Sequence, residues 1–267
     1  HDRDDLFVYR TENDFEMERF NLMWTMGVAA DMDVSLRFSL VHFENGFLDQ
    51  PLTDYHSWLG VPNAGREDRP NNKFRNRIYN KDGSLAWKGE SRKLSGANLE
   101  VYSRWTPLHV VFDGGSTLDA GGRFSVKLPT GSDGAGLDSG EGDVSAGGLL
   151  SWRLGRFGLD ANLDFVLPGG YEFRSGDDYE VLPYVKGMVC AQLRLVDWLF
   201  AVVQLAGNSL VVDAPSGLDL FTGPACMGTF GFKVKLTRFE FSGAIGEDVS
   251  ANADADVTLL LGASVRW

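Results

Sequence analysis

Few side chains in this sequence could carry acid–base or nucleophilic chemistry. The histidines are His1, His42, His56 and His109. A Ser–His nucleophilic pair needs both side chains on one face within hydrogen-bond reach, yet His42 falls on the opposite parity from Ser35 and Ser39 in an alternating segment. The sequence also contains no Gly-x-Ser-x-Gly elbow and no phosphate-binding loop. We therefore predict no catalytic residue, and an enzyme is less favoured than a non-enzymatic protein.

The sequence contains no motif for a metal site or a cofactor site either. The two cysteines, Cys190 and Cys226, belong to no Cys/His group with the spacing of a zinc site. A Gly-rich acidic segment, 130–142, lacks the spacing of a calcium loop. We predict no metal and no cofactor. We also predict two free thiols, because the cysteines fall on predicted strands that a third strand separates.

Charged side chains recur at alternate positions and could line a polar lumen. The basic members of this set are Arg37, Arg104, Arg123, Lys127, Arg153, Lys186, Arg194, Lys233, Lys235, Arg238 and Arg266. The acidic members are Asp33, Glu100, Asp119, Asp143, Asp160, Asp164, Glu180, Glu240 and Asp256. Such charges either pair across neighbouring strands as a polar core or select solutes in a water-filled pore. Lys233, Lys235 and Arg238 gather around one predicted turn, where they could attract anions.

β-strands would have to position these charges. In residues 256–267 the apolar side chains of Val257, Leu259 and Leu261 share one parity, and polar side chains dominate the other. The same alternation covers 33–43, 97–105, 118–128, 144–154, 157–167, 181–195, 229–236 and 238–246, with further strands over 15–28 and, weakly, 5–10. We count about 12 strands, each near the ~9–11 residues that cross a bilayer at a tilt. The segment 106–116 either extends a hairpin or marks a shift of register.

Two features favour a membrane barrel over a soluble β-sandwich, whose apolar strand faces would form an internal core. Short turns near 30–32, 155–156, 196–198 and 237 alternate with longer polar loops, as in outer-membrane barrels. Aromatic residues gather near the short-turn end, which is typical of an aromatic girdle at a membrane interface. The girdle residues are Trp24, Trp105, Trp152, Phe157, Trp198, Phe239 and Trp267. We predict an all-β, transmembrane, antiparallel up-and-down β-barrel of about 12 strands.

Composition is compatible with this architecture. The chain has 267 residues and a formal net charge of −12, and it lacks the ~18 consecutive apolar residues that a membrane helix needs. The acidic balance argues against nucleic-acid binding, which calls for a basic face. We predict one outer-membrane domain over 1–267 in a Gram-negative bacterium, with any signal peptide removed. An even strand count would place both termini in the periplasm.

The segment 44–83 is long for a loop, and loops of this length are usually functional. Apolar residues at helical spacing predict a short helix that opens at Asp49 or Thr53 and ends at Gly60. The second half is locally basic. The candidate loop or plug residues are Phe47, Asp49, Tyr55, His56, Trp58, Arg66, Arg69 and Lys73. Three placements stay open, in decreasing order of preference: a plug or lid in the lumen, packing on the barrel rim, or contact with lipopolysaccharide phosphates.

Three stretches resemble an outer-membrane family of unknown function, the domain-of-unknown-function family 3187. They are Gly46 to Arg66, which resembles the family's Gly-Phe-Leu-Asp…His…Gly-Arg signature, the polar continuation Asp68 to Phe74, and Val126-Lys-Leu-Pro-Thr-Gly131. The resemblance covers roughly 15–170. Pro51 and Ala64 depart from the family pattern. The resemblance implies a barrel with a signature loop, and it implies no activity because the family has none assigned.

Three functions follow from this pattern. The leading hypothesis is a channel or porin-like passage for small polar or charged solutes, narrowed by 44–83. The alternatives are a closed scaffold barrel whose outer loops bind a protein partner, and an enzyme that acts on lipid or lipopolysaccharide through His42 or His56. The expected partners are outer-membrane lipids, lipopolysaccharide and small polar solutes, with no nucleic acid.

Overall fold

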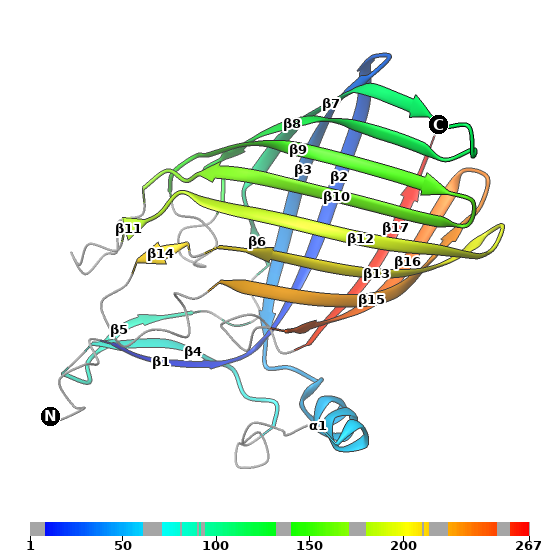
Figure 1. The fold of residues 1–267 in the computed structure, drawn as a ribbon. Coiled ribbons are helices and arrows are strands. Elements are labelled where there is room, and N and C mark those ends of the chain that lie inside the picture. Colours follow the sequence, from blue (N-terminus) through cyan, green and yellow to red (C-terminus); the bar gives the residue numbers. More distant parts are fainter. Residues whose placement is uncertain are drawn as a thin grey trace, which may run out of the picture.

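The computed structural model describes residues 9–60, 71–80, 82–89, 91, 94–131, 140–170, 180–209, 211–213, 224–249 and 257–266. One large antiparallel sheet dominates it and curls around a central space (Figure 1). In spatial order its strands are β17 (Val257–Val265), β16 (Phe239–Asp248), β15 (Ala225–Lys235), β13 (Leu199–Asn208), β12 (Tyr184–Val196), β10 (Phe157–Leu167), β9 (Asp143–Leu154), β8 (Thr117–Leu128), β7 (Leu99–Val111), β3 (Met32–Glu44) and β2 (Glu16–Ala29). The short strand β6 (Ser95–Gly96) pairs with β3 beside this path.

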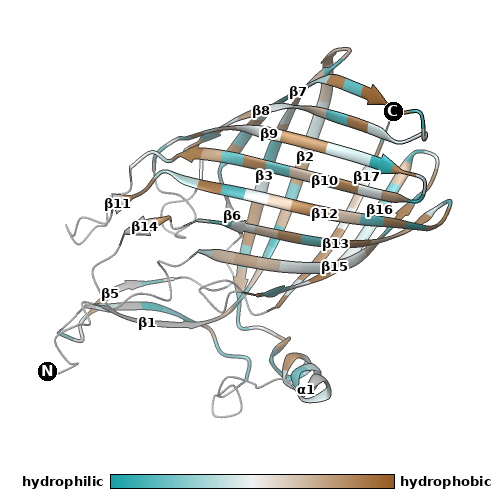
Figure 2. Cartoon of the chain, in the orientation of Figure 1, coloured by the Kyte–Doolittle hydropathy of each residue, from teal (hydrophilic) through white to brown (hydrophobic). Residues whose placement is uncertain are grey.

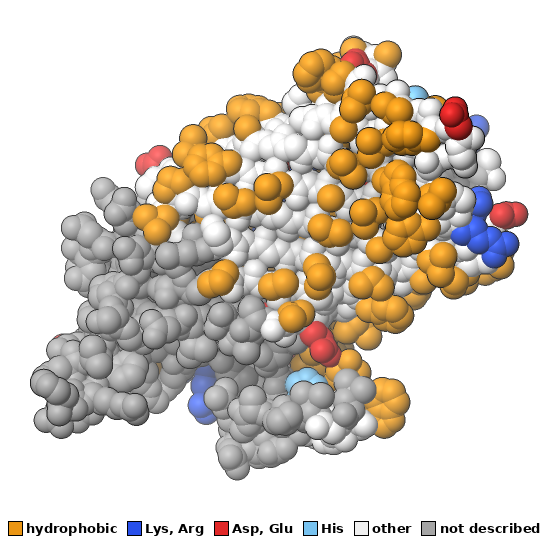
Figure 3. Space-filling view, viewed as in Figure 1, with side chains coloured by type: hydrophobic (Ala, Val, Ile, Leu, Met, Phe, Trp, Pro, Cys, Tyr) orange, Lys and Arg blue, Asp and Glu red, His pale blue; other side chains and the backbone are white. Residues whose placement is uncertain are grey.

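The predicted all-β, antiparallel up-and-down architecture is confirmed. Sequence neighbours pair throughout the main path, and the strands have the length that a tilted crossing of a bilayer needs. Apolar and polar residues alternate along the strands (Figure 2). Hydrophobic side chains spread over the outer surface of the sheet (Figure 3). Because cross-strand partners share a face, the ladder assigns each alternating set to the outer or the inner face.

The two edges of the main sheet are β2 and β17, and no ladder joins them among the described residues. Glu16, at the start of β2, pairs with Glu44 at the long-loop end, whereas Val265, at the end of β17, pairs with Phe239 at the short-turn end. The continuous path has eleven antiparallel strands. Because this number is odd, its two edge strands run in the same direction. The expectation of both termini on one side rested on an even count of strands, and the described strands do not provide it.

The opening strand was predicted wrongly. β1 (Tyr9–Asp14) leaves the main sheet and pairs with β4 (Arg75–Asn80), which continues to β5 (Leu85–Lys88). This three-stranded sheet lies at the long-loop end (Figure 1). A further two-stranded pair, β11 (Glu180–Val181) with β14 (Val212–Asp213), connects two of the longer loops. The second half of the 44–83 segment therefore contributes a strand, β4, that the sequence pattern did not predict.

The predicted helix in this segment is confirmed as α1 (Asp49–Leu59). Gly60 ends it in the left-handed conformation with φ 71°, and its N–H group donates to the carbonyl groups of His56 and Ser57. No described helix is long and apolar enough to span a bilayer.

The segment 106–116 extends a hairpin and also contains a shift of register, so both sequence interpretations are confirmed. β7 continues to Val111, and a shift of register between Trp105 and Leu108 accommodates Thr106, whose N–H group donates to the carbonyl of Asp31. A small apolar cluster formed by Val41, Phe43, Ala97, Phe15 and Phe74 lies at the opposite, long-loop end. It packs where β3 continues past its ladder with β7, which ends at Arg37.

Candidate functional site: the charged inner face

Three ion pairs join directly opposed residues on the inner face. Arg37 on β3 binds Glu100 on β7 at 2.5 Å, and Lys127 on β8 binds Asp143 on β9 at 2.8 Å. The third joins Arg104 on β7 to Asp33 on β3, with Nε at 2.9 Å from Oδ2. Opposite charges in register stabilise a ladder only modestly where they are exposed. These pairs give one wall of the lumen a polar surface whose charges are compensated.

A more buried pair spans three strands. Arg123 on β8, Gly147 on β9 and Asp164 on β10 lie in register, and the Arg123 side chain crosses over Gly147 to reach the Asp164 carboxylate. Its Nε lies 2.6 Å from Oδ1 of Asp164, and its Nη2 donates to the Asn162 side chain at 2.8 Å. Asp164 is 1% exposed. Gly147 thus provides the space in which a buried carboxylate meets its counter-ion.

Replacing Gly147 with alanine tests this arrangement. An added Cβ would lie 2.2 Å from Oδ1 of Asp164 and from the carbonyl oxygen of Leu163, so the strand or the ion pair must move. We expect the free energy of unfolding in detergent micelles to fall by about 1–3 kcal/mol. The matched control is Gly148→Ala on the outer face, where the nearest atom is 3.9 Å away. Equal stability of the two variants would contradict the proposed role of Gly147.

The same geometry recurs toward the short turns. Gly158 on β10 lies in register between Arg153 on β9 and Gln192 on β12, and both long side chains pack over it. The Asp160 carboxylate accepts hydrogen bonds from Nη2 of Arg153 at 2.7 Å and from Nε2 of Gln192 at 3.2 Å. Asp160 therefore compensates the Arg153 charge and fixes the Gln192 amide.

Beyond Gln192 the inner wall becomes basic. Arg194 on β12, Phe200 on β13 and Lys233 on β15 lie in register across three strands. Lys235 places its ammonium group 5.1 Å from the centre of the Phe200 ring. Among the described residues, neither Arg194 nor Lys233 has a carboxylate within ion-pair distance. The charges that were predicted to face the lumen thus divide into a paired wall and a basic wall.

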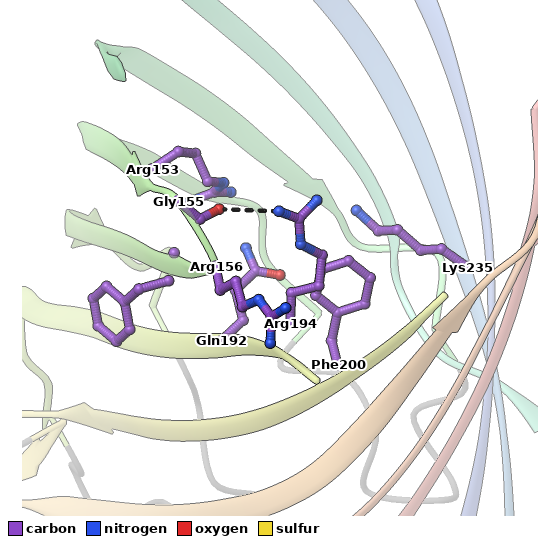
Figure 4. A pocket seen from close by; sticks show the side chains of 9 residues that line it. Arg153, Gly155, Arg156, Gln192, Arg194, Phe200 and Lys235 are labelled. Atoms are coloured by element: carbon purple, nitrogen blue, oxygen red, sulfur yellow. Dashed lines mark hydrogen bonds between the residues drawn. The ribbon is translucent and has the colours of Figure 1, made fainter. Parts of the chain in front are cut away.

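Arg194, Phe200 and Lys235 border a pocket of about 220 Å³ at the short-turn end (Figure 4). Arg194 and Gln192 come from β12, Phe200 from β13 and Lys235 from β15. The Arg194 guanidinium donates to the carbonyl of Gly155 in the β9–β10 turn at 3.5 Å, which is a weak contact. The pocket therefore combines positive charge, the aromatic rings of Phe157 and Phe200, and one amide.

The remaining residues that were predicted to line the lumen lie in different places: on the inner face, in a hairpin extension or in a turn. Lys186 lies opposite Asp164 on the inner face, without an ion pair among the described residues. Asp119 lies 2.6 Å from His109 in the extended β7–β8 hairpin. Lys235 and Arg266 each lie 3.9 Å from Glu240, and Arg238 is exposed in the β15–β16 turn rather than on the lumen wall.

α1 lies outside the lumen. The Tyr55 hydroxyl donates to Oε1 of Glu247 at 2.8 Å, and Glu247 shares its parity with the outward-facing Phe241 and Ile245 of β16. At the start of α1, the Leu48 N–H group donates to Glu16 of β2 at 2.5 Å. The helix therefore links the outer ends of both edge regions of the sheet. Of the three placements, the rim agrees with these contacts, and the preferred lumen plug does not.

Other predicted residues of this segment surround α1. Asp49 accepts a hydrogen bond from the Asn72 N–H group at 2.7 Å, which holds the returning chain against the helix. Phe47 and Trp58 are 65% and 79% exposed, and Lys73 is also exposed. His56 is half-buried, and its Nδ1 has no hydrogen-bond partner among the described residues. Arg66 and Arg69 lie outside the described residues.

The Tyr55–Glu247 contact makes the attachment of α1 sensitive to alkaline pH. The hydrogen bond to Glu247 raises the pKa of Tyr55 above its ordinary value of 10.0. A raised tyrosine pKa means that the neutral phenol is favoured in the folded state, so the contact is complete below pH ~10 and is lost as pH rises through the raised pKa. We expect Tyr55→Phe to expose α1 to proteases at neutral pH and to abolish any further increase at high pH. Unchanged protease resistance of the variant would show that other contacts hold the helix.

The predicted aromatic girdle lies on the outer face near the short turns. Trp24, Trp105 and Trp198 are exposed there, and Phe239 stacks on Phe241 with ring centres 6.5 Å apart. Trp152 and Phe157 flank the β9–β10 turn with ring centres 5.9 Å apart. Trp267 lies outside the described residues. Contact of these rings with a membrane interface stays a prediction.

The histidines do not assemble a nucleophilic site in the described part of the chain. Nδ1 of His42 lies 3.3 Å from Glu18 and 4.0 Å from Glu44 on the outer side of β2 and β3, and no hydroxyl or thiol contacts it there. One ligand atom from each of these three residues lies within 4.8 Å of the others, so this is the described group whose spacing could hold an ion. No disulfide joins Cys190 to Cys226 in the described structure.

Sequence reasoning missed four residues of the inner face: Gly147, Gly158, Gln192 and Phe200. Parity placed Gly147, Gly158 and Gln192 on the lumen side, but glycine and glutamine carry no charge that would single them out. Phe200 belongs to β13, which the sequence pattern did not list as a strand. Their roles depend on the register between strands, which the ladder supplies. A glycine that falls opposite an arginine in a predicted hairpin, as Gly158 falls opposite Arg153, was the available signal.

Comparisons with known proteins agree with this fold. The predicted family resemblance is confirmed over residues 8–132, which match the family described as "Protein of unknown function (DUF3187)". The fold is similar to that of an outer membrane channel from Pseudomonas putida F1, with a TM-score of 0.58, 11% identity and coverage of 94% of this chain and 83% of that chain. CdiB from Escherichia coli gives a TM-score of 0.39 at 14% identity, over 94% of this chain and 45% of that chain. A search among curated proteins returned no match.

Proposed function

We propose that this chain forms a channel in the bacterial outer membrane through which small polar or charged solutes pass. The two-faced sheet carries this proposal. Its outer face exposes apolar side chains around the whole curl, and its inner face holds the ion pairs and the basic wall. A bilayer solvates the first kind of surface and water solvates the second, which is the arrangement of membrane barrels.

The distribution of side-chain size on the inner face supports an open lumen. Barrels of eight strands are filled by side chains, and barrels of sixteen strands leave a channel. The strand number of this sheet lies between the two, so it does not decide whether the lumen is open. The paired wall carries long side chains. The inner faces of β15 and β16, by contrast, place small residues such as Gly231, Ala244 and Gly246 in adjacent register. Small residues on one wall leave room for solutes beside the ion pairs.

We also propose an orientation for the channel. The short turns and their aromatic side chains would lie at the periplasmic side, and the long loops, α1 and the three-stranded sheet would lie outside. The basic pocket would then be at the periplasmic mouth. Narrowing of the passage would come from the inner-face charges rather than from α1, which contacts the rim.

Proteoliposome swelling tests the proposed passage. We expect liposomes that contain the folded protein to swell in monosaccharides and in small organic salts, and to swell much more slowly in a tetrasaccharide. The control is protein denatured by heat before reconstitution. Swelling no faster than in the control, with protein that migrates as a folded barrel on gels, would contradict an open channel.

The exposed side of α1 favours a second role at the outer rim. Phe47 and Trp58 project from a segment that is anchored to both edge regions of the sheet, at the level where outer-leaflet headgroups would lie. Aromatic rings prefer this interface. We propose contact with lipopolysaccharide there. Loss of co-purifying lipopolysaccharide in Phe47→Ser/Trp58→Ser would support it, and unchanged retention would favour a protein partner or none.

A further inference from the structure

We propose that the pocket at the short-turn end binds a small organic carboxylate that also carries a hydroxyl group. This inference rests on the proposed channel function, because the bound molecule would be the solute that the channel prefers. The pocket is lined by Arg194, Gln192, Phe200 and Lys235, together with Arg153, Arg156 and Phe157. Three features of these residues point to this class of ligand.

The first feature is cationic charge without a carboxylate counter-ion. Arg153 already donates to both oxygens of Asp160, at 2.7 and 3.0 Å. Arg194 lies two strand positions from Gln192 on the same face, and its guanidinium group makes only the weak contact with Gly155 among the described residues. A guanidinium group presents two parallel N–H donors that match a carboxylate. Lys235, 3.9 Å from Glu240, adds a second cation whose own ion pair is loose.

The second feature is a buried acceptor that is unsatisfied. Gln192 is 8% exposed, and its Oε1 has no hydrogen-bond partner among the described residues. The orientation of the amide is fixed, because Nε2 donates to the Asp160 carboxylate. A buried acceptor without a donor destabilises the protein, because it has lost its hydrogen bonds to water and gained none in return. A hydroxyl group of a bound solute would supply that donor beside the cations.

The third feature is the flat apolar surface of Phe200. Its ring lies between Arg194 and Lys233 in register and beneath the Lys235 ammonium group (Figure 4). The ring leaves the carbon skeleton of a solute a surface to lie on while its carboxylate reaches Arg194. The cavity of about 220 Å³ limits the ligand to a small molecule. Charge, acceptor and ring together therefore select a hydroxy-carboxylate over a simple anion or a neutral sugar.

Calorimetric titration of the purified protein in detergent tests the site without requiring permeation. The probes are gluconate, hexanoate and glucose. We expect gluconate to bind at least tenfold more tightly than hexanoate, and glucose not to bind at millimolar concentration. Arg194→Gln should abolish binding of both anions, while Gln192→Leu should lower gluconate affinity to that of hexanoate. Arg238→Gln, a cation in the exposed β15–β16 turn outside the pocket, should bind like the wild type.

Equal affinity for gluconate and hexanoate, or wild-type binding by Arg194→Gln, would overturn the proposal. If Gln192→Leu does not fold, Arg194→Gln and the comparison of the three probes still decide the outcome. Failure of the channel is distinguishable, because a protein that binds gluconate in detergent but causes no liposome swelling would refute passage and retain the site. Liposome swelling without selective binding of gluconate would refute the binding site and retain the passage.

Discussion

Replacing Arg123 with alanine is expected to lower the free energy of unfolding by about 3–5 kcal/mol, the range for removing one partner of a buried ion pair. Asp164 is almost fully buried, and in the described structure its carboxylate meets only the Arg123 guanidinium as a counter-ion. Without Arg123 the carboxylate is left unpaired or must take up a proton. Urea titration of the protein in micelles, followed by the gel shift between folded and unfolded forms, measures the loss.

Arg104→Ala is the matched control for this experiment. Arg104 also pairs with an aspartate on the inner face, but its side chain is 57% exposed, so water compensates Asp33 when the arginine is removed. We expect a loss below about 1 kcal/mol. The double variant Arg123→Ala/Asp164→Asn should recover part of the stability, because it removes the buried charge as well. Equal losses for Arg123→Ala and Arg104→Ala would contradict the view that burial of Asp164 makes the first pair critical.

If the chain forms the proposed channel, reversing the charge of Lys233 and Lys235 is expected to change its preference from anions to cations. Each unit charge about 7 Å from an ion changes its energy by about 0.6 kcal/mol in water. The double Lys→Glu variant changes the charge of the basic wall by four units in all. After screening by salt, a shift of about tenfold in the anion-to-cation permeability ratio is expected. The reversal potential under a potassium chloride gradient measures this ratio.

The control for this variant is Lys73→Glu/Lys88→Glu. It makes the same change of net charge on exposed residues at the long-loop end, away from the basic wall. Its permeability ratio should stay within about twofold of the wild type, since exposed charges more than a Debye length away are largely screened. If both double variants shift the ratio equally, selectivity would come from overall charge, and the basic wall would have no special role.

The strand pattern could be predicted from the sequence because it depends on local parity. Alternation of the kind seen from Val257 to Val265 fixes which face each residue occupies, and the ladder places Arg37 opposite Glu100 and Lys127 opposite Asp143 on the inner face. The helix could be predicted for the same reason, since spacing and a terminal glycine are local signals. Gly60 takes the left-handed conformation that this role requires.

Features that depend on contacts between distant segments could not be predicted. The pairing of β1 with β4 joins residues about sixty-five positions apart, and no pattern within either strand specifies the partner. The strand count of twelve included this opening segment, so the main path has eleven strands, and the placement of both termini in the periplasm stays a prediction. The position of α1 was likewise set by Tyr55 reaching Glu247, 192 residues away. The crossing of Arg123 over Gly147 required the register of three strands.

Single-channel recording in planar bilayers tests the central claim most directly. Purified protein that is shown to be folded by its gel migration is added to one side of a bilayer in potassium chloride. We predict discrete current steps of uniform size, with a reversal potential that indicates preference for chloride. A current that stays at the baseline of the protein-free bilayer, with folded protein inserted in the membrane, would contradict the proposal that this sheet encloses a passage.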